Sequence, residues 1–432
     1  MELPARAGPS LSVQPMKSLP CLSLALLLVP TLVAAELTPD AAIHHAVTQQ
    51  PELAAARLLV TEARARREQA GLLSNPELEA EARPNSNGRE GVLAFGLTQR
   101  FPLTRRLQAE RAVSDAEITA AEAELREAER QLAQRTALAV TDWLSTLARL
   151  DLAARQLTNA QTFAAALQAA ADKGEVSRID ARQLTLEAGQ IALRRRQIEQ
   201  EQAILRGELR RLLNLAAAEP LELSGTLPEA GPWIAPDQAT ETNARPELQI
   251  ALARLETARR ETHLARTQRW QDVGVGLVSE MQRSEDEPAG MQRDDFVGLR
   301  VALPLPFWNR NQGHIRETET LVQRRQLELE AVQLRVRTEQ DAARDALALA
   351  TTTEREWREQ QLPLTRELEE QLRRQKEAGQ ASFTDWARAR ERRLQAEAGH
   401  LEARRDLLRT WLQAQAAFGQ FPTFPNFRGT TP

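Results

Sequence analysis

The sequence has one cysteine, no tyrosine and few aromatic residues, and each shortage excludes a class of structure. Cys21 lies in the N-terminal segment, so the mature chain predicted below has no thiol for a disulfide or a thiolate metal site. Aromatic residues form only 4% of the chain, while alanine, leucine, glutamate and arginine are abundant. This composition is typical of long helices that pack through small side chains, and it argues against a large conventional globular core.

An excess of one charge and long hydrophobic runs are also missing. The 56 basic and 60 acidic residues are interspersed and nearly cancel, so no basic face for nucleic acid is expected. After residue 36 no apolar run reaches about 18 residues, the length a membrane-spanning helix needs. If this chain crosses a membrane, it must do so with strands.

No pattern in the sequence is typical of catalysis or metal binding. We find no glycine-rich phosphate loop, no nucleophile with a paired base and no acid pair at catalytic spacing, and we predict no enzyme activity and no cofactor. His44 and His45 are adjacent on a predicted helix and therefore point in different directions, while His263, His314 and His400 stand alone, so no helical zinc site is expected. We therefore predict no metal ligands and interpret the histidines as surface or junction residues: His44, His45, His263, His314 and His400.

The first 35 residues are interpreted as a signal peptide. A cationic start at residues 16–17 precedes an apolar stretch at 22–29 and small residues at 33–35, the order that signal peptidase requires. The mature chain would begin at Glu36. Residues 1–15 are interpreted as an upstream extension or a misassigned start.

The main positive feature is an internal duplication. Pro51-Glu52-Leu53 recurs as Pro246-Glu247-Leu248, and the segment Gly174 to Asp180 recurs as Gly379 to Asp385. The repeat of about 200 residues is much longer than a solenoid unit of about 20 to 50 residues. We predict these segments: a first repeat at 36–213, a linker at 214–245, a second repeat at 246–418 and a loosely ordered tail at 419–432.

Each repeat is expected to contain a pair of strands. In the first repeat a helix at 41–73 precedes strands at 77–83 and 91–99. In the second, strands at 273–278 and 296–303 flank a polar loop at 280–295. Four strands are too few to close a transmembrane barrel, which needs about eight. A membrane location would therefore require several chains, because unpaired strand edges are not tolerated in lipid.

Two very long helices follow the strand pairs, at 105–172 and 315–377. Apolar residues in steps of three and four predict a coiled-coil seam, and 68 residues would span on the order of 100 Å. Each helix is expected to turn at a glycine, Gly174 or Gly379, and to be followed by a return helix capped by Ser177 or Ser382. The return helices are predicted at 178–213 and 383–418.

The duplicated order of helix, strand pair, long helix, glycine turn and return helix resembles the TolC-type outer-membrane efflux factors over residues 36–420. The segment from Leu303 to Ile315 resembles the strand-to-helix junction of the heavy-metal (cation) efflux branch, to which CzcC belongs. Its counterpart in the first repeat runs from Gln99 to Arg106. The junction residues carrying this resemblance are Phe101, Pro102, Pro304, Pro306, Asn309, Asn311, Gln312 and Gly313.

The resemblance implies a homotrimer in the outer membrane, with a 12-stranded β-barrel continued by a helical barrel across the periplasm. It would conduct heavy-metal cations passively, with a periplasmic adaptor and an inner-membrane resistance-nodulation-division pump as partners. The turn residues Gly174, Ser177, Gly379 and Ser382 would contact the adaptor.

In the family, the acid that matches Asp385 lines the narrowest aperture, and the acid that matches Asp180 helps to hold it shut. Three copies of Asp385 would form a carboxylate ring that attracts cations. Both aspartates also suit the first turn of a helix for a simpler reason, the positive end of its dipole. Lys376 and Ala381 stand where the drug-export members have an aromatic and a basic latch, so the closing contacts must differ.

Other functions remain open from sequence alone. A channel for drug efflux or type I protein secretion would share the same architecture. A periplasmic adaptor usually has one helical hairpin rather than two, and a soluble coiled-coil scaffold would not explain an export signal together with alternating strands.

Overall fold

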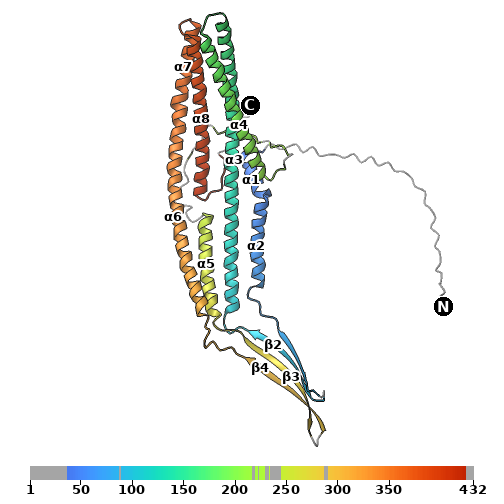
Figure 1. The fold of residues 1–432 in the computed structure, drawn as a ribbon. Helices are drawn as coiled ribbons and strands as arrows, with labels where there is room; N and C mark the ends of the chain where they lie inside the picture. The colour runs from blue at the N-terminus through green and yellow to red at the C-terminus, as the bar shows by residue number, and fades with distance from the viewer. Residues whose placement is uncertain are drawn as a thin grey trace, which may run out of the picture. The chain divides into compact units, whose positions relative to one another are not determined.

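The computed structural model describes residues 37–86, 89–216, 219–221, 223–228, 233, 245–286 and 290–424. The predicted signal peptide, much of the predicted linker and the last eight residues lie outside these ranges. Within them, helices and strands follow one another in the same order twice (Figure 1).

The first helical stretch consists of two helices, α1 (Pro39–Gln49) and α2 (Pro51–Gln69), so the single helix predicted at 41–73 is wrong. Pro51 has no N–H and disfavours a helical conformation in the residue before it. Gln50 is accordingly extended, with φ −73° and ψ 123°. The start of α1 is capped by Thr38, whose hydroxyl accepts a hydrogen bond from the Ala41 N–H at 3.3 Å.

Four antiparallel strands form one sheet in the order β1-β2-β3-β4. The strands are β1 (Glu77–Pro84), β2 (Gly91–Phe101), β3 (Val273–Asp286) and β4 (Gly290–Ala302). The central pair, β2 and β3, comes from different repeats, with Leu97 opposite Leu277. The sheet therefore joins the two halves of the duplication.

The second strand pair is longer than predicted, and the polar loop expected at 280–295 is wrong. The β3–β4 ladder continues from Met281 opposite Asp295 as far as Asp286 opposite Gly290. Alternation of apolar residues stops in this region, but backbone pairing does not depend on side-chain polarity. The hairpin can therefore extend with polar side chains on both faces.

The remaining elements are long helices that run beside one another (Figure 1). They are α3 (Arg106–Asp172), α4 (Arg178–Leu212), α5 (Pro246–Thr267), α6 (Gln312–Glu356), α7 (Leu362–Glu377) and α8 (Phe383–Ala417). α3 contains 67 residues without a break, which confirms the long helix predicted from the apolar seam. The two predicted return helices, α4 and α8, each differ from the prediction by one residue at the C-terminal end.

The second long helix is interrupted by a π-helical turn at Trp357–Gln361, so the uninterrupted helix predicted at 315–377 is wrong. Pro363 cannot donate a backbone hydrogen bond, and its ring crowds the carbonyl four residues earlier. The wider turn just before it accommodates this residue. Gly399 of α8 provides space for Trp357, since a Cβ there would lie 2.6 Å from the indole ring.

α3 is the central helix and contacts α1, α2, α4, α5 and α8. The main hydrophobic core lies where α1, α2, α3, α4 and α8 meet, around Leu132 and Val140 of α3 and Leu412 of α8. Phe424 also belongs to this core, and its backbone N–H donates to Asp40 Oδ1 at 3.0 Å. The expectation of a loosely ordered tail is therefore wrong for residues 419–424.

Buried charges join the repeats beside this core. Arg130 of α3 is paired with Glu127 at 2.6 Å and with Glu247 at the start of α5 at 3.5 Å. Arg245, with only 4% of its side chain exposed, contacts Glu247 and also Glu339 of α6, at 2.7 Å. Removing one member would leave a buried charge without its partner, so this network holds α3, α5 and α6 in register.

The predicted fold class is confirmed for the single chain: it is mainly α, with two long helical hairpins and one small sheet. In the part of the chain that the structure describes, no helix combines the length and the apolar character needed to cross a membrane.

Candidate functional site

One face of the sheet is apolar and exposed. The register aligns Leu78, Leu97, Leu277 and Leu299 in a single row across all four strands. Between 50% and 76% of each of these residues is exposed, and Val297 in the neighbouring row is 82% exposed. A contiguous apolar surface of this kind marks contact with lipid or with another protein.

The opposite face of the sheet carries mostly small or polar side chains. Arg300 of β4 donates to Glu79 of β1 at 3.2 Å, so this ion pair crosses the two strands between them. Glycine leaves the space that neighbouring side chains need on this face, since a Cβ on Gly276 would lie only 2.6 Å from Thr98 Oγ1. The sheet therefore has one apolar and one polar face, the alternation found in strands that separate lipid from water.

The sheet has two open edges. Within the described residues, β1 pairs only with β2, and β4 pairs only with β3. Each outer strand therefore presents backbone N–H and C=O groups with no partner in the ladder. Such edges require either water or another strand.

Exposed apolar residues form one stripe on α4 and another on α6–α7. These helices lie on opposite sides of the helical layer (Figure 1). Residues within each stripe are spaced by 7, 11 or 15, all close to whole numbers of helical turns. Each of these residues is more than half exposed: Ile179, Leu186, Leu193 and Ile204 on α4, and Leu327, Leu334, Leu349 and Leu364 on α6–α7. Neither stripe has a partner among the residues that the structure describes.

The predicted junction residues of the second repeat lie where β4 meets α6. Asn311 precedes α6 with φ +57°, a left-handed conformation that asparagine tolerates better than most residues. Its side-chain amide donates to the Ala265 carbonyl at 2.8 Å, which ties the start of α6 to α5. Asn309 Oδ1 and Gln312 Oε1 accept backbone N–H groups within the same loop, at 3.0 and 2.8 Å. These contacts explain why polar side chains occur here.

The other predicted junction residues have simpler environments. Phe101 is 46% exposed at the end of β2. Pro102, Pro304 and Pro306 are half-buried, and Gly313 is exposed in the first turn of α6.

The sequence did not reveal a polar contact that joins the β2–α3 and α5–β3 connections. Arg106, at the start of α3, is paired with Asp272 before β3 at 2.7 Å and also contacts Glu110. Burial lowers the pKa of Arg106, but hydrogen bonds to the two carboxylates more than offset this and raise it. Asp272 could not be recognised because its partner is 166 residues away.

The turn between α3 and α4 and the turn between α7 and α8 have the same structure, and we call them the tip turns. Gly174 and Gly379 adopt left-handed conformations with φ +77° and +72°, as expected for glycine after a helix. Ser177 Oγ then accepts the Ile179 N–H at 3.2 Å, and Ser382 Oγ accepts the Asp385 N–H at 3.1 Å. Both predicted caps are therefore present.

Asp180 and Asp385 lie in the first turns of α4 and α8, and both are exposed. Asp385 Oδ2 also accepts a hydrogen bond from Ser382 Oγ at 2.6 Å. This contact and the helix dipole are sufficient reasons for an acid at this position in one chain. An acidic ring would require further copies.

An aromatic cluster lies just below the turns at Gly174 and Gly379. Phe163 of α3 contacts Phe383 and Trp386 of α8, with ring centroids 5.3 Å apart in each case. Lys376 Nζ of α7 lies 3.8 Å from the centroid of the Trp386 ring, a cation–π contact. Lys376, at the position where the family resemblance predicts an aromatic latch, thus links α7 to α8 within the second hairpin. Phe163 links this second hairpin to the first.

A groove of about 800 Å³ separates α4 from α8, and Asp180 is among the residues that line it. Glu391 also lies in this groove. Burial and, to a smaller extent, the charge of Glu187 raise the pKa of Glu391, while a hydrogen bond from Gln395 opposes the shift. The protonated form of Glu391 is therefore favoured by folding.

Glu391→Gln should raise the melting temperature of the purified protein near neutral pH. A raised pKa in the folded state supplies stability below the unfolded value of 4.5 and loses it as pH rises through the folded value. The variant removes that loss, so the two proteins should melt alike below about pH 4 and diverge above it. Glu402→Gln, an exposed groove residue, is the control. Equal melting temperatures at every pH would contradict the assignment.

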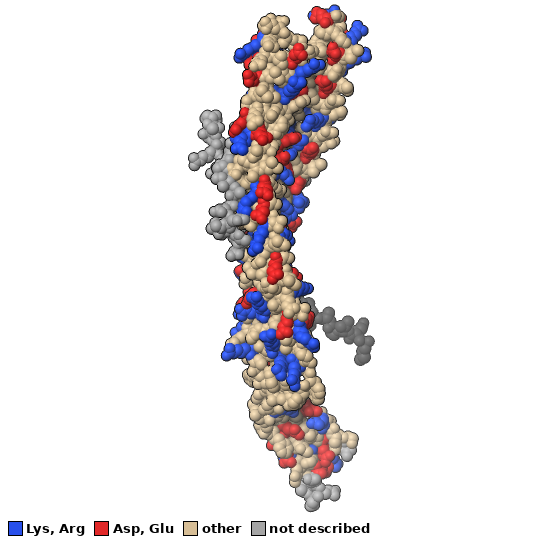
Figure 2. Space-filling view, turned by 90° about the vertical axis from the view of Figure 1, so that its left-hand side faces the viewer, with Lys and Arg blue, Asp and Glu red and all other residues tan. Residues whose placement is uncertain are grey.

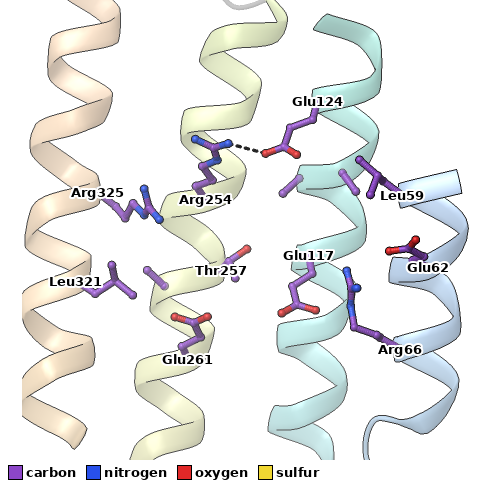
Figure 3. Close-up of a pocket in the computed structure, with 13 residues that line it drawn as sticks. Leu59, Glu62, Arg66, Glu117, Glu124, Arg254, Thr257, Glu261, Leu321 and Arg325 are labelled. Atoms are coloured by element: carbon purple, nitrogen blue, oxygen red, sulfur yellow. Dashed lines mark hydrogen bonds and ion pairs between the residues drawn. The ribbon is translucent and has the colours of Figure 1, made fainter. Parts of the chain in front are cut away.

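A smaller cavity of about 360 Å³ lies between α2, α3, α5 and α6 (Figure 3). Arg254 of α5 and Glu124 of α3 are paired across it at 2.6 Å. Burial raises the pKa of Glu261, and the nearby charge of Glu117 adds to the effect. Glu62, Glu117, Glu124 and Glu261 all line this cavity, but no three of these described carboxylates are grouped closely enough to hold a metal ion.

Two histidines contact carboxylates. His400 Nε2 lies 3.1 Å from Glu354 Oε1 on a neighbouring helix, and His314 Nδ1 lies 3.1 Å from Glu317 Oε2. Among the described residues, no group of three or more histidine, cysteine or acidic side chains could hold a metal ion.

No family model and no curated protein matches this sequence. Solved structures do match. A crystal structure of CusC, studied for the changes that accompany its folding and transmembrane channel formation, superposes with a TM-score of 0.71 at 17% identity, covering 89% of this chain and 93% of CusC. This chain has the TolC-like channel fold.

Two further structures agree. The outer membrane protein VceC of Vibrio cholerae has a TM-score of 0.70 at 16% identity, covering 88% of this chain and 96% of VceC. The MtrE outer membrane channel of Neisseria gonorrhoeae, in its open state, has a TM-score of 0.68 at 15% identity, covering 88% of this chain and 89% of MtrE. The likeness extends over nearly the whole length of each protein.

Proposed function

We propose that this protein is the outer-membrane channel of a tripartite efflux system, and that it conducts substrate passively from the periplasm to the exterior. The observation that carries the proposal is the sheet: it is apolar and exposed on one face, polar on the other, and open at both edges. In this assignment the apolar face contacts lipid, the polar face lines the pore, and the helices extend into the periplasm. The protein catalyses no reaction.

Three copies would close the sheet. If β1 of one chain pairs with β4 of the next, the same contact repeats around a ring, and each open edge acquires a partner. Three chains contribute 12 strands, an even number within the range of bacterial barrels. Two open strand edges and an exposed apolar sheet face would be unfavourable in a soluble monomer.

The apolar stripes on the helices support the same ring. The helices that carry the two stripes, α4 and α6–α7, lie on opposite sides of the helical layer (Figure 1). A ring contact would place α4 of one copy against α6–α7 of the next and bury both stripes. Sheet and helices would then close around one axis into a continuous channel.

The tip turns and the aspartates beside them would provide the proposed cation selectivity and the binding site for the adaptor. Three copies of Asp385 would form a cation-attracting ring at the periplasmic mouth, and Asp180 would hold the closed state. The turns at Gly174 and Gly379 would contact a periplasmic adaptor, which connects the channel to an inner-membrane resistance-nodulation-division pump. Heavy-metal cations are the proposed substrate, supported by this acidic mouth and by the junction motif.

The channel assignment is tested by fractionation and conductance. The protein should be recovered from outer membranes only with detergent, sediment as a trimer, and form ion-conducting pores in planar bilayers. A freely soluble periplasmic product would favour an adaptor or a coiled-coil scaffold. Detergent-solubilised protein that stays monomeric and never conducts would overturn the proposal.

Substrate class needs a separate experiment. A deletion strain should become sensitive to one or more of cobalt, zinc, cadmium, copper and silver, and a plasmid copy should restore resistance. Sensitivity to drugs alone, or loss of a secreted protein, would replace the metal assignment with drug efflux or type I secretion.

A further inference from the structure

The connections between the helices and the sheet expose large apolar side chains. Trp308 is the extreme case, with 89% of its surface exposed. All four connections contribute at least one such residue: Leu72 and Leu73 between α2 and β1, Leu103 between β2 and α3 together with Phe101 at the end of β2, Trp270 between α5 and β3, and Leu303, Leu305, Phe307 and Trp308 between β4 and α6. We call this set, together with the arginines described next, the junction collar.

Four exposed arginines accompany these apolar residues: Arg105, Arg269, Arg310 and Arg316. None of them has a carboxylate partner among the described residues. The segments 100–110, 266–272 and 303–319 hold seven arginines but only four acidic residues, and those four are already paired: Glu110 and Asp272 with Arg106, Glu319 with Arg266, and Glu317 with His314. The collar therefore carries uncompensated positive charge.

The far end of the sheet has the opposite charge. The described residues 81–86, 89–90, 280–285 and 290–295 include six acidic and four basic residues. Figure 2 shows basic side chains gathered at the end of the helices that adjoins the sheet, with a band of uncharged surface beside them and acidic side chains farther along the sheet. The molecule is thus electrically polarised along the direction in which the proposed channel crosses the membrane.

We propose that the junction collar binds the headgroups of anionic phospholipids in the leaflet on the helical side of the membrane. This inference rests on the proposed function. Exposed aromatic side chains gather at the headgroup level, where one part of the ring contacts acyl chains and another contacts water. Arginine guanidinium groups beside them would pair with lipid phosphates.

The distribution of the arginines favours a lipid surface over a pocket for a free phosphate. Arg105, Arg269 and Arg310 lie in three different connections, each with exposed apolar residues, and Arg316 lies in α6 just after the third of them. A single soluble anion would need convergent donors, whereas a layer of headgroups can meet each arginine separately. The apolar members would enter the acyl region of the same leaflet.

The test measures lipid selectivity directly. The full mature protein is reconstituted in phosphatidylcholine vesicles that contain a trace of spin-labelled phosphatidylglycerol or spin-labelled phosphatidylcholine. We expect the wild type to select phosphatidylglycerol by a factor of about three or more, because each arginine near the surface contributes up to about fivefold. Raising the ionic strength to about 1 M should reduce this selection, because the Debye length falls to about 3 Å.

The collar variant replaces Arg105, Arg269, Arg310 and Arg316 together by glutamine, and should lose the selection. The control replaces four exposed arginines elsewhere on the helices that have no carboxylate partner in the described part of the chain: Arg135, Arg182, Arg337 and Arg366. The control should keep the selection in full. Circular dichroism and sedimentation confirm that both variants fold and assemble.

Three results would overturn the inference: a wild type without selection, a collar variant that keeps it, and selection abolished by millimolar inorganic phosphate at constant ionic strength. The last would identify a phosphate site. Conductance of the same wild-type preparation separates this failure from that of the channel itself. Pores without lipid selection reject only the collar, whereas absence of pores rejects the proposed function.

Discussion

Leu277→Arg should abolish trimer assembly and conductance. Leu277 lies in the apolar row of β3 and is 61% exposed in the single chain. Arginine facing lipid near the midplane of a barrel costs about 2–4 kcal/mol per chain, so a trimer would lose roughly 6–12 kcal/mol. On a water-exposed face the same change would alter stability by less than about 0.5 kcal/mol. The measurement is the yield of detergent-extracted trimer together with conductance in planar bilayers.

The neighbouring residue provides a matched control. Val278 is one position along the same strand, on the polar face, where its partners across the sheet are Gly96 and Gly298. Val278→Arg should therefore assemble normally and change only the conductance, because the new charge would face the pore. If Leu277→Arg assembles and conducts like the wild type, the apolar face does not contact lipid.

Asp385→Asn should weaken block of the channel by divalent cations applied from the helical side. Asparagine keeps an oxygen that can accept the hydrogen bond from Ser382 but removes three negative charges from the proposed ring. The concentration for half-block should rise by about tenfold, because the field that concentrates cations at the mouth is lost. The measurement is single-channel current against divalent concentration at fixed ionic strength.

Asp180→Asn distinguishes the ring from a general loss of charge. This acid holds the equivalent position in the first repeat, at the start of α4, and is proposed to act on closure. Its replacement should change the half-blocking concentration by no more than about twofold while increasing the time spent open. If both variants weaken the block equally, or neither does, the aperture assignment of Asp385 is wrong.

Local chemistry made much of the fold predictable. The glycine turns at the tip, with Ser177 and Ser382 as caps, follow from preferences that operate within a few residues, and the structure has them as expected. The apolar seam of α3 has the helical period, which identifies a helix without reference to its neighbours. The alternation at 77–83 likewise identified β1.

The errors have both local and non-local causes. The break at Gln50 could have been inferred from Pro51, because a residue before proline disfavours the helical conformation. The π turn at Trp357–Gln361 is harder to predict, since its position depends both on Pro363 and on the space that Gly399 provides from another helix. The polar ends of β3 and β4 carried no alternation, so only backbone pairing could reveal them.

The sequence by itself determined the elements: which segments are helices or strands, where the hairpins turn, and that the unit occurs twice. These depend on backbone preferences and on the period of apolar residues, which neighbours in the chain already express. Tertiary structure alone decided which surfaces remain without partners. Arg106 meets Asp272, Phe163 meets Trp386, and the apolar stripes of α4 and α6–α7 remain exposed because of how distant segments pack, and no local pattern encodes such distances.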